Sequence, residues 1–162
     1  LADVEICSAG AHRMKRTYVM AVLACFAALL AAPTAMARDT KVMRPIADAM
    51  TTPDAKARLN MGVQFLFGNT AHPPVAQSFG EFMSNKKTNG TNKSDKEACE
   101  WAFLSAMLSF QQRAVAVGGN AVINIRSYYK QNEVSSETQY ECGSGALMSG
   151  VTFKGEVVKL QP

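Results

Sequence analysis

The residues of this chain best able to do chemistry are two cysteines and a histidine. Beyond residue 38, Cys99, Cys142 and His72 supply all of the thiol and imidazole groups. A site for a soft metal needs several such ligands converging on one ion. Three potential ligands are too few to indicate a metal site. His72, in a proline-rich stretch, is the remaining weak candidate ligand. Catalytic disulfides usually have the spacing Cys-x-x-Cys, and cysteines 43 positions apart favour a structural role.

Two sequence motifs of catalytic proteins are absent. Ser144 lies between Gly143 and Gly145, but the string Gly-x-Ser-x-Gly that presents a nucleophilic serine is absent. Phosphate-binding loops need Gly-x-x-x-x-Gly-Lys-Ser/Thr, because backbone N–H groups and a lysine hold the phosphates. Gly150 and Gly155 have the glycine spacing, but Glu156 follows where the lysine should be. We therefore expect no catalytic constellation and no cofactor.

The N-terminal part of the sequence has the pattern of an export signal. Met14 opens a short basic segment, Val19–Ala32 is nearly all apolar, and Ala35–Ala37 offers the small residues that a signal peptidase needs. The apolar run is shorter than the roughly 20 residues of a membrane-spanning helix. We therefore predict a signal peptide over 14–37, and we interpret residues 1–13 as upstream translation.

The remaining residues, 38–162, are predicted to form one domain that is exported to the periplasm. An alternative is lipidation at Cys25, but the apolar residues that follow it are unlike the polar tether of a lipoprotein. Residues 38–162 carry 14 basic and 11 acidic side chains, a net charge of +3. This mildly basic balance does not indicate a nucleic-acid partner.

Cys99 and Cys142 are predicted to form a disulfide. Two cysteines in an oxidising compartment are a natural pair. Ser94 and Glu97 form a capping-box pattern, and Gly118 suits a helix end, so a helix is expected over 95–117. Its apolar face contains Cys99, and the alternation around Cys142 places that residue on the core-facing side of a strand.

The rest of the pattern predicts an α+β fold, with one long helix packed on a mostly antiparallel sheet. A short helix is expected from residue 53 to about 59, and residues 84–94 are expected to be an exposed loop. Residues 143–145 should interrupt the sheet. The expected strands are 62–67, 75–83, 121–125 continued by 126–130, 137–142, and one or two strands within 146–160.

Four runs carry a family resemblance: Gly80–Asn89, Asn92–Cys99, Gly118–Lys130 and Tyr140–Ala146. They resemble a small family of proteobacterial exported proteins that is catalogued as "excinuclease ATPase subunit". That name implies an ATPase, which the missing phosphate loop does not support.

A helix followed by Gly-Gly-Asn-Ala-Val is distantly similar to two further groups. One is a heavy-metal-binding family of pentameric cytosolic proteins, and the other is the outer-membrane stress-sensor lipoprotein of the Rcs phosphorelay. The second likeness implies a bridge between the helix start and a late strand, which Cys99 and Cys142 match.

Basic and aromatic residues form a candidate recognition patch. Its members come from the expected loop and a neighbouring strand: Lys86, Lys87, Lys93, Arg126, Tyr128, Tyr129 and Lys130. Residues of this kind more often form a solvated loop beside packed strand residues; the functional alternative is a patch that meets an envelope protein or an anionic envelope component. The sequence thus favours a non-catalytic binding or envelope-stress-related domain, with periplasmic heavy-metal binding as the alternative function.

Overall fold

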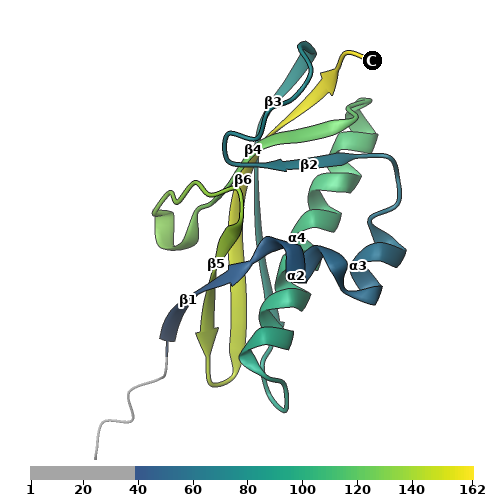
Figure 1. Ribbon diagram of the computed structural model, residues 1–162. Helices are drawn as coiled ribbons and strands as arrows, with labels where there is room; N and C mark the ends of the chain where they lie inside the picture. Colours follow the sequence, from purple (N-terminus) through teal and green to yellow (C-terminus); the bar gives the residue numbers. More distant parts are fainter. Residues whose placement is uncertain (1–38) are drawn as a thin grey trace, which may run out of the picture. The chain divides into compact units, whose positions relative to one another are not determined.

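The computed structural model describes residues 39–162, so the predicted export signal and Cys25 lie outside the described residues. Figure 1 shows the path of the chain. Its elements are β1 (Asp39–Pro45), α2 (Ile46–Thr51), α3 (Pro53–Arg58), β2 (Gln64–Phe67), β3 (Val75–Asn89), α4 (Asp95–Val117), β4 (Ala121–Ser127), the 3₁₀ turn η1 (Tyr129–Gln131), β5 (Gln139–Gly145) and β6 (Met148–Leu160). Within residues 39–162, no helix is long and apolar enough to cross a membrane.

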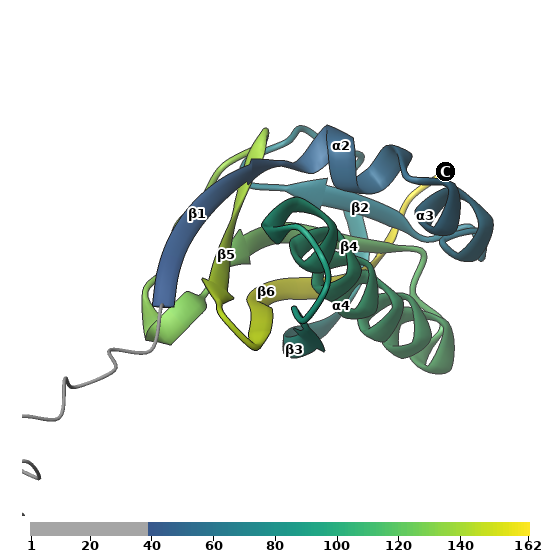
Figure 2. The ribbon, with the colours of Figure 1, turned by 90° about the horizontal axis from the view of Figure 1, so that it is seen from below.

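Six strands form one curled sheet in the order β1-β5-β6-β4-β2, with β3 paired to β6 as well. β3 follows one edge of β6, while β5 and β4 share its other edge. All of these pairings are antiparallel except that of β2 with β4. The sheet bends around α4, as Figure 2 shows. The predicted α+β architecture is therefore confirmed.

Helix α4 has the predicted boundaries because both ends are capped. The Ser94 hydroxyl accepts a hydrogen bond from the Glu97 backbone N–H at 3.1 Å. At the other end, Gly118 adopts the left-handed conformation with φ 80°, which glycine does without a steric penalty. Apolar side chains three and four positions apart then cover one face of the helix, which packs on β3 and β6.

An aromatic cluster fills the space between α4 and the sheet. The ring of Phe103 lies 4.7 Å from that of Tyr140, 5.6 Å from Phe153 and 5.9 Å from Phe67, measured between centroids. All four side chains are buried. Burial of each large apolar side chain stabilises the fold by about 1.5–3 kcal/mol, so this cluster is a main source of core stability.

The disulfide joins Cys99 of α4 to Cys142 of β5, as predicted, with a Cα–Cα distance of 5.9 Å. Both residues are fully buried beside the aromatic cluster. The bridge therefore holds the first turns of α4 against the strand that follows the long 128–138 connection.

The predicted loop over residues 84–94 is wrong for its first half. Residues 84–89 continue β3, which pairs with β6 over its whole length. The segment was predicted as a loop because its residues are polar. One of them, Ser84, is nevertheless buried, and its hydroxyl donates a hydrogen bond to the Ala106 carbonyl of α4 at 3.3 Å. Tertiary pairing thus overrides the weak local preference for a strand.

Two other expectations are also wrong. The strand through Ile125 ends at Ser127 rather than at Lys130, because a 3₁₀ turn begins at Tyr129. Residues 143–145 do not interrupt the sheet; they complete β5 and pair with β1. The Tyr129 ring lies against the backbone of Gly143, within 1.9 Å of where a Cβ would be, so a larger residue at this position would displace the ring.

Candidate functional site

A groove on the face of the sheet away from α4 is the candidate binding site. It is an open hollow of about 680 Å³ between β3, β6 and the loop after β4. One phenol, one thioether, two ammonium groups and three neutral polar side chains line it: Tyr128, Met83, Lys130, Lys154, Asn85, Gln131 and Thr152. Side chains with these hydrogen-bonding groups and cations suit a ligand rich in hydroxyl groups and negative charge.

The loop that forms one wall of the groove has a strained backbone. Lys130 and Gln131 follow each other with φ angles of 51° and 64°, a region that residues other than glycine rarely adopt. The base of the loop is held by reciprocal backbone hydrogen bonds of 3.0 and 2.9 Å between Ser127 and Val134. The Tyr128 N–H also donates to the Thr152 carbonyl at 2.7 Å. Strain of this kind persists where the surroundings fix it and is concentrated at functional sites.

An ion-pair network borders the groove. Lys154 lies 3.0 Å from Glu133 and 3.8 Å from Glu81, and the Arg126 guanidinium contacts the same two carboxylates. The hydrogen bonds from Arg126 and Lys154 lower the pKa of Glu133, and the bond to Glu133 raises the pKa of Lys154. The Lys154 ammonium also lies 3.7 Å from the centroid of the Tyr128 ring. The Lys154 side chain is therefore charged at neutral pH and held in a fixed position in the lining of the groove.

Beneath the same loop, Glu141 is a buried carboxylate with 1% of its surface exposed. Alternation along β5 places it on the face opposite Tyr140 and Cys142. Its partner is Lys41 of β1, at 2.8 Å. The 128–138 connection covers this face of β5, with the Tyr129 ring lying on Gly143. The start of the connection, at Tyr129, thus lies on the sheet, while residues 130–133 are exposed.

The predicted recognition patch is only partly brought together. Tyr128 and Lys130 line the groove, and Arg126 lies beside it but is held by Glu81 and Glu133. Tyr129 packs on Gly143 instead of facing the groove.

The three remaining lysines of the patch lie toward the other end of β3. Lys87 shares the groove's face of the sheet, while its neighbour Lys86 points to the opposite face because side chains alternate along a strand. Lys93 lies in the β3–α4 turn, where its ammonium donates to the Asn89 carbonyl at 3.3 Å. Lys154 also lines the groove, but it is not among the residues predicted from the sequence, because the apolar residues of its strand indicate a core strand. Only the alternation along the strand, which places Lys154 on the same face as Thr152, could have indicated its position.

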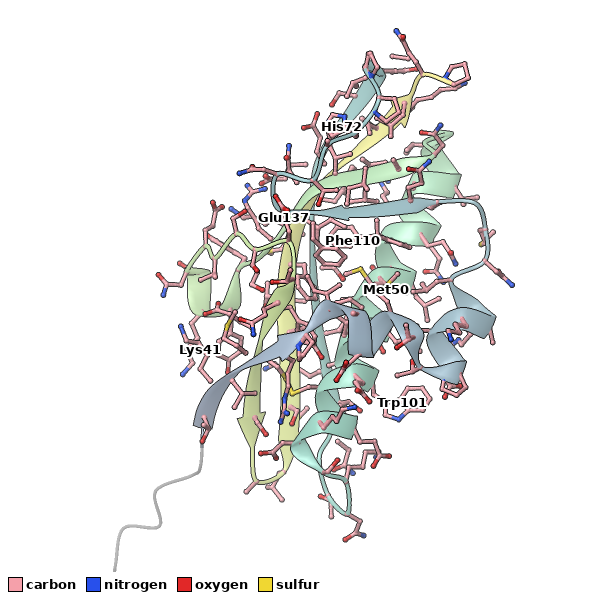
Figure 3. All side chains as sticks on the ribbon, viewed as in Figure 1. Lys41, Met50, His72, Trp101, Phe110 and Glu137 are labelled. Carbon is pink, nitrogen blue, oxygen red and sulfur yellow. A yellow bond between two sulfur atoms is a disulfide. The ribbon has the colours of Figure 1, made fainter. Side chains whose placement is uncertain are left out.

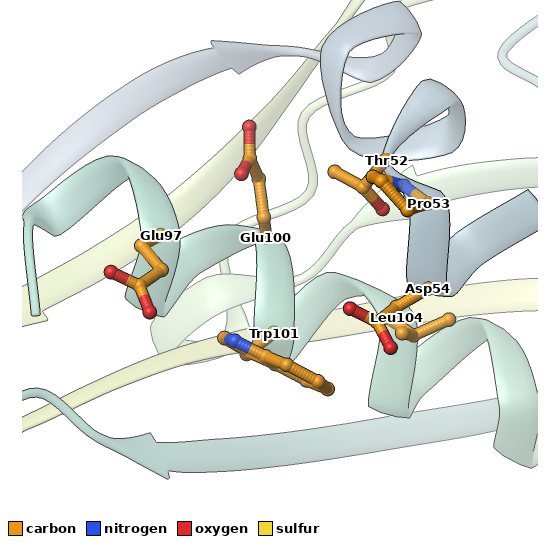
Figure 4. A pocket seen from close by; sticks show the side chains of 7 residues that line it. All are labelled: Thr52, Pro53, Asp54, Glu97, Glu100, Trp101 and Leu104. Carbon is orange, nitrogen blue, oxygen red and sulfur yellow. The ribbon is translucent and has the colours of Figure 1, made fainter.

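A second hollow lies between α3 and α4 and was not predicted. This cleft, of about 300 Å³, is shown in Figure 4. Its lining combines three carboxylates with an indole and small side chains: Asp54, Glu97, Glu100, Trp101, Thr52, Pro53 and Leu104. The sequence places Trp101 in an apolar stripe of the helix, but its ring forms a wall of the cleft. The charge of the cleft is thus opposite to that of the lysines in the groove.

The residues considered for metal binding and hydrolysis are separated. His72 is exposed on the β2–β3 connection, toward the upper end of the view in Figure 3, and its Nδ1 lies 2.8 Å from the Pro73 carbonyl. The two cysteines are committed to the disulfide. Ser144 is fully buried, with its hydroxyl 3.5 Å from that of Ser149. Among residues 39–162, no group of three or more His, Cys, Asp or Glu side chains is placed to hold a metal ion.

Comparisons of the chain with models of protein families, with characterised proteins and with solved structures find no match.

Proposed function

We propose that this protein is an exported, non-catalytic binding domain of the bacterial periplasm, and that its groove binds an anionic, hydroxyl-rich component of the envelope. One observation carries the proposal: Tyr128, Lys130 and Lys154 line the same groove together with neutral polar side chains. The ammonium groups would contact carboxylates or phosphates of the ligand, and the amide and hydroxyl groups its hydroxyls.

The arrangement around Lys154 supports binding rather than catalysis. Its ammonium is fixed by Glu133 and the Tyr128 ring, so the cation is oriented before a ligand arrives. Pre-orientation reduces the entropy that binding must offset. Glu81 and Glu133 balance the charges of Arg126 and Lys154, so Lys130 is the cation of the lining that this network does not neutralise. Salt-sensitive, moderate affinity is the expected result.

Export is supported by two independent features. The residues of 14–37 have the order of a secretory signal. The disulfide between Cys99 and Cys142 is of the kind that persists in oxidising compartments. Since both cysteines are held in that bridge, the alternative of heavy-metal binding has no specific observation in its favour.

The test is titration of the exported protein with oligogalacturonate, a phosphorylated oligosaccharide and neutral maltodextrin, followed by NMR shifts and calorimetry. We expect the anionic sugars to shift the resonances of the groove and maltodextrin to have little effect. Lys130→Ala should weaken binding by about two- to fivefold, as for loss of one exposed ion pair. Lys159→Ala, an exposed lysine of β6 away from the groove, is the matched control. Shifts confined to other surfaces, or equal loss in both variants, would refute the proposal.

A further inference from the structure

The turn between β5 and β6 exposes two large apolar side chains. Leu147 has 71% of its surface exposed and Met148 has 53%. The turn is firmly held, because the Gly90 N–H donates to the Leu147 carbonyl at 2.9 Å and Asn89 pairs with Met148. We refer to residues 146–148 as the tip. It is a fixed apolar projection rather than a loose loop.

Lysines surround the tip and acidic residues are missing from the segments that build it. Lys86 and Lys87 pair with Val151 and Gly150 just behind the tip, and their side chains leave on opposite faces of the sheet. Lys93 lies in the adjoining β3–α4 turn. Segments 84–94 and 143–151 contain these three lysines and no Asp or Glu. Three lysines therefore flank the tip, while in the adjoining elements Asp39 of β1 pairs with Gly145 and Asp95 opens α4.

The described chain also begins at this end of the domain. The first residue of β1, Asp39, pairs with Gly145 at the end of β5. Figure 1 shows the start of β1, the β5–β6 turn and the β3–α4 turn toward the same end of the molecule.

We propose that the tip docks on an anionic phospholipid surface, with Leu147 and Met148 entering the interface and Lys86, Lys87 and Lys93 contacting lipid phosphates. Apolar side chains flanked by lysines are the composition of peripheral membrane contacts, where apolar burial and attraction to anionic lipid act together. A protein partner fits less well, because protein interfaces bury about 800 Å² per partner and are depleted in lysine. The proposal rests on residues other than those of the groove, so either can fail without the other.

The test is sedimentation of the exported protein with vesicles of phosphatidylglycerol mixed with phosphatidylcholine, and with vesicles of phosphatidylcholine alone. Attraction to anionic lipid is worth about fivefold in partitioning for each lysine near the surface. The Lys86→Gln, Lys87→Gln, Lys93→Gln triple variant should therefore bind roughly 100-fold more weakly. Leu147→Ser with Met148→Ser should lose about tenfold or more.

Matched controls separate docking from general effects. Met61→Ser removes a methionine of similar exposure, 54%, from the connection between α3 and β2, and Lys159→Gln removes a charge from the far end of β6. Both controls should bind vesicles like the unaltered protein. Circular dichroism and the melting temperature check folding; should the double serine variant be unstable, the lysine variant and its salt dependence decide the question. Equal binding to neutral vesicles, controls that lose as much as the tip variants, or vesicle-independent capture of a protein through the tip would overturn the proposal.

Discussion

Removal of the Cys99–Cys142 bridge should be the most destabilising change that leaves the aromatic core intact. The bridge closes a loop of 43 residues, and in the chain-entropy model such a closure stabilises the folded state by about 4 kcal/mol. A protein of this size has a free energy of unfolding of about 5–15 kcal/mol. Cys99→Ala with Cys142→Ala should therefore remove a quarter or more of the total stability, with a further small loss from the space that the two buried sulfurs leave.

The assay is equilibrium unfolding in urea, followed by the fluorescence of Trp101, the single tryptophan of the chain and a residue of α4. The double variant should show a lower midpoint and a steeper dependence on urea, because an unfolded chain without the bridge exposes more surface. Reduced, unaltered protein should resemble the variant, and reductant should not affect the variant further. A difference below about 1 kcal/mol, or two free thiols in the unaltered exported protein, would refute the reasoning.

Three further outcomes follow from single contacts. Tyr140→Phe should stabilise the protein by roughly 1 kcal/mol in urea unfolding, because the buried Tyr140 hydroxyl has no hydrogen-bond partner among the described residues; a loss of stability would contradict this. Burial raises the pKa of Tyr140, so its phenol stays protonated when the unfolded chain ionises; stability should fall above pH 10 by about 1.4 kcal/mol per pH unit, and Tyr140→Phe should lack this component. Gly143→Ala should cost about 1–3 kcal/mol because its Cβ would collide with Tyr129, whereas Gly90→Ala, with its nearest neighbours at 3.7 Å, should be tolerated.

Local signals in the sequence were sufficient for the long helix and the cross-link. Ser94 caps the N-terminus of α4 and Gly118 caps its C-terminus. Each cap acts within one helical turn, so the bounds of α4 could be predicted from these two residues alone. The spacing of Cys99 and Phe103 along the helix and of Tyr140 and Cys142 along the strand placed all four side chains in the core. These features depend on neighbours in sequence, which is why they were accessible.

The groove could not be assembled in the same way, because its members come from strands paired over long sequence separations. Met83 lies opposite Lys154 only through the register of β3 with β6, and a bulge between Ser78 and Glu81 sets part of that register. Lys86 and Lys87 are grouped by the sequence because both fall in the expected exposed loop, yet they lie on a strand, where adjacent residues face opposite sides of the sheet. The cleft wall formed by the half-buried Trp101 depends on the position of α3 beside α4, which the periodicity along α4 does not indicate.

The disulfide also bears on the surface that we assign to lipid. Cys99 lies one turn into α4, directly after the β3–α4 turn that carries Lys93, and Cys142 lies on β5, which leads into the tip. The disulfide thus links α4, which follows the β3–α4 turn with Lys93, to β5, which precedes the tip. The groove has no such link, since its walls are held by strand pairing and by the Ser127–Val134 bridge. Oxidation therefore fixes the geometry of the tip more directly than that of the groove, so the two surfaces should respond differently to reduction of the protein.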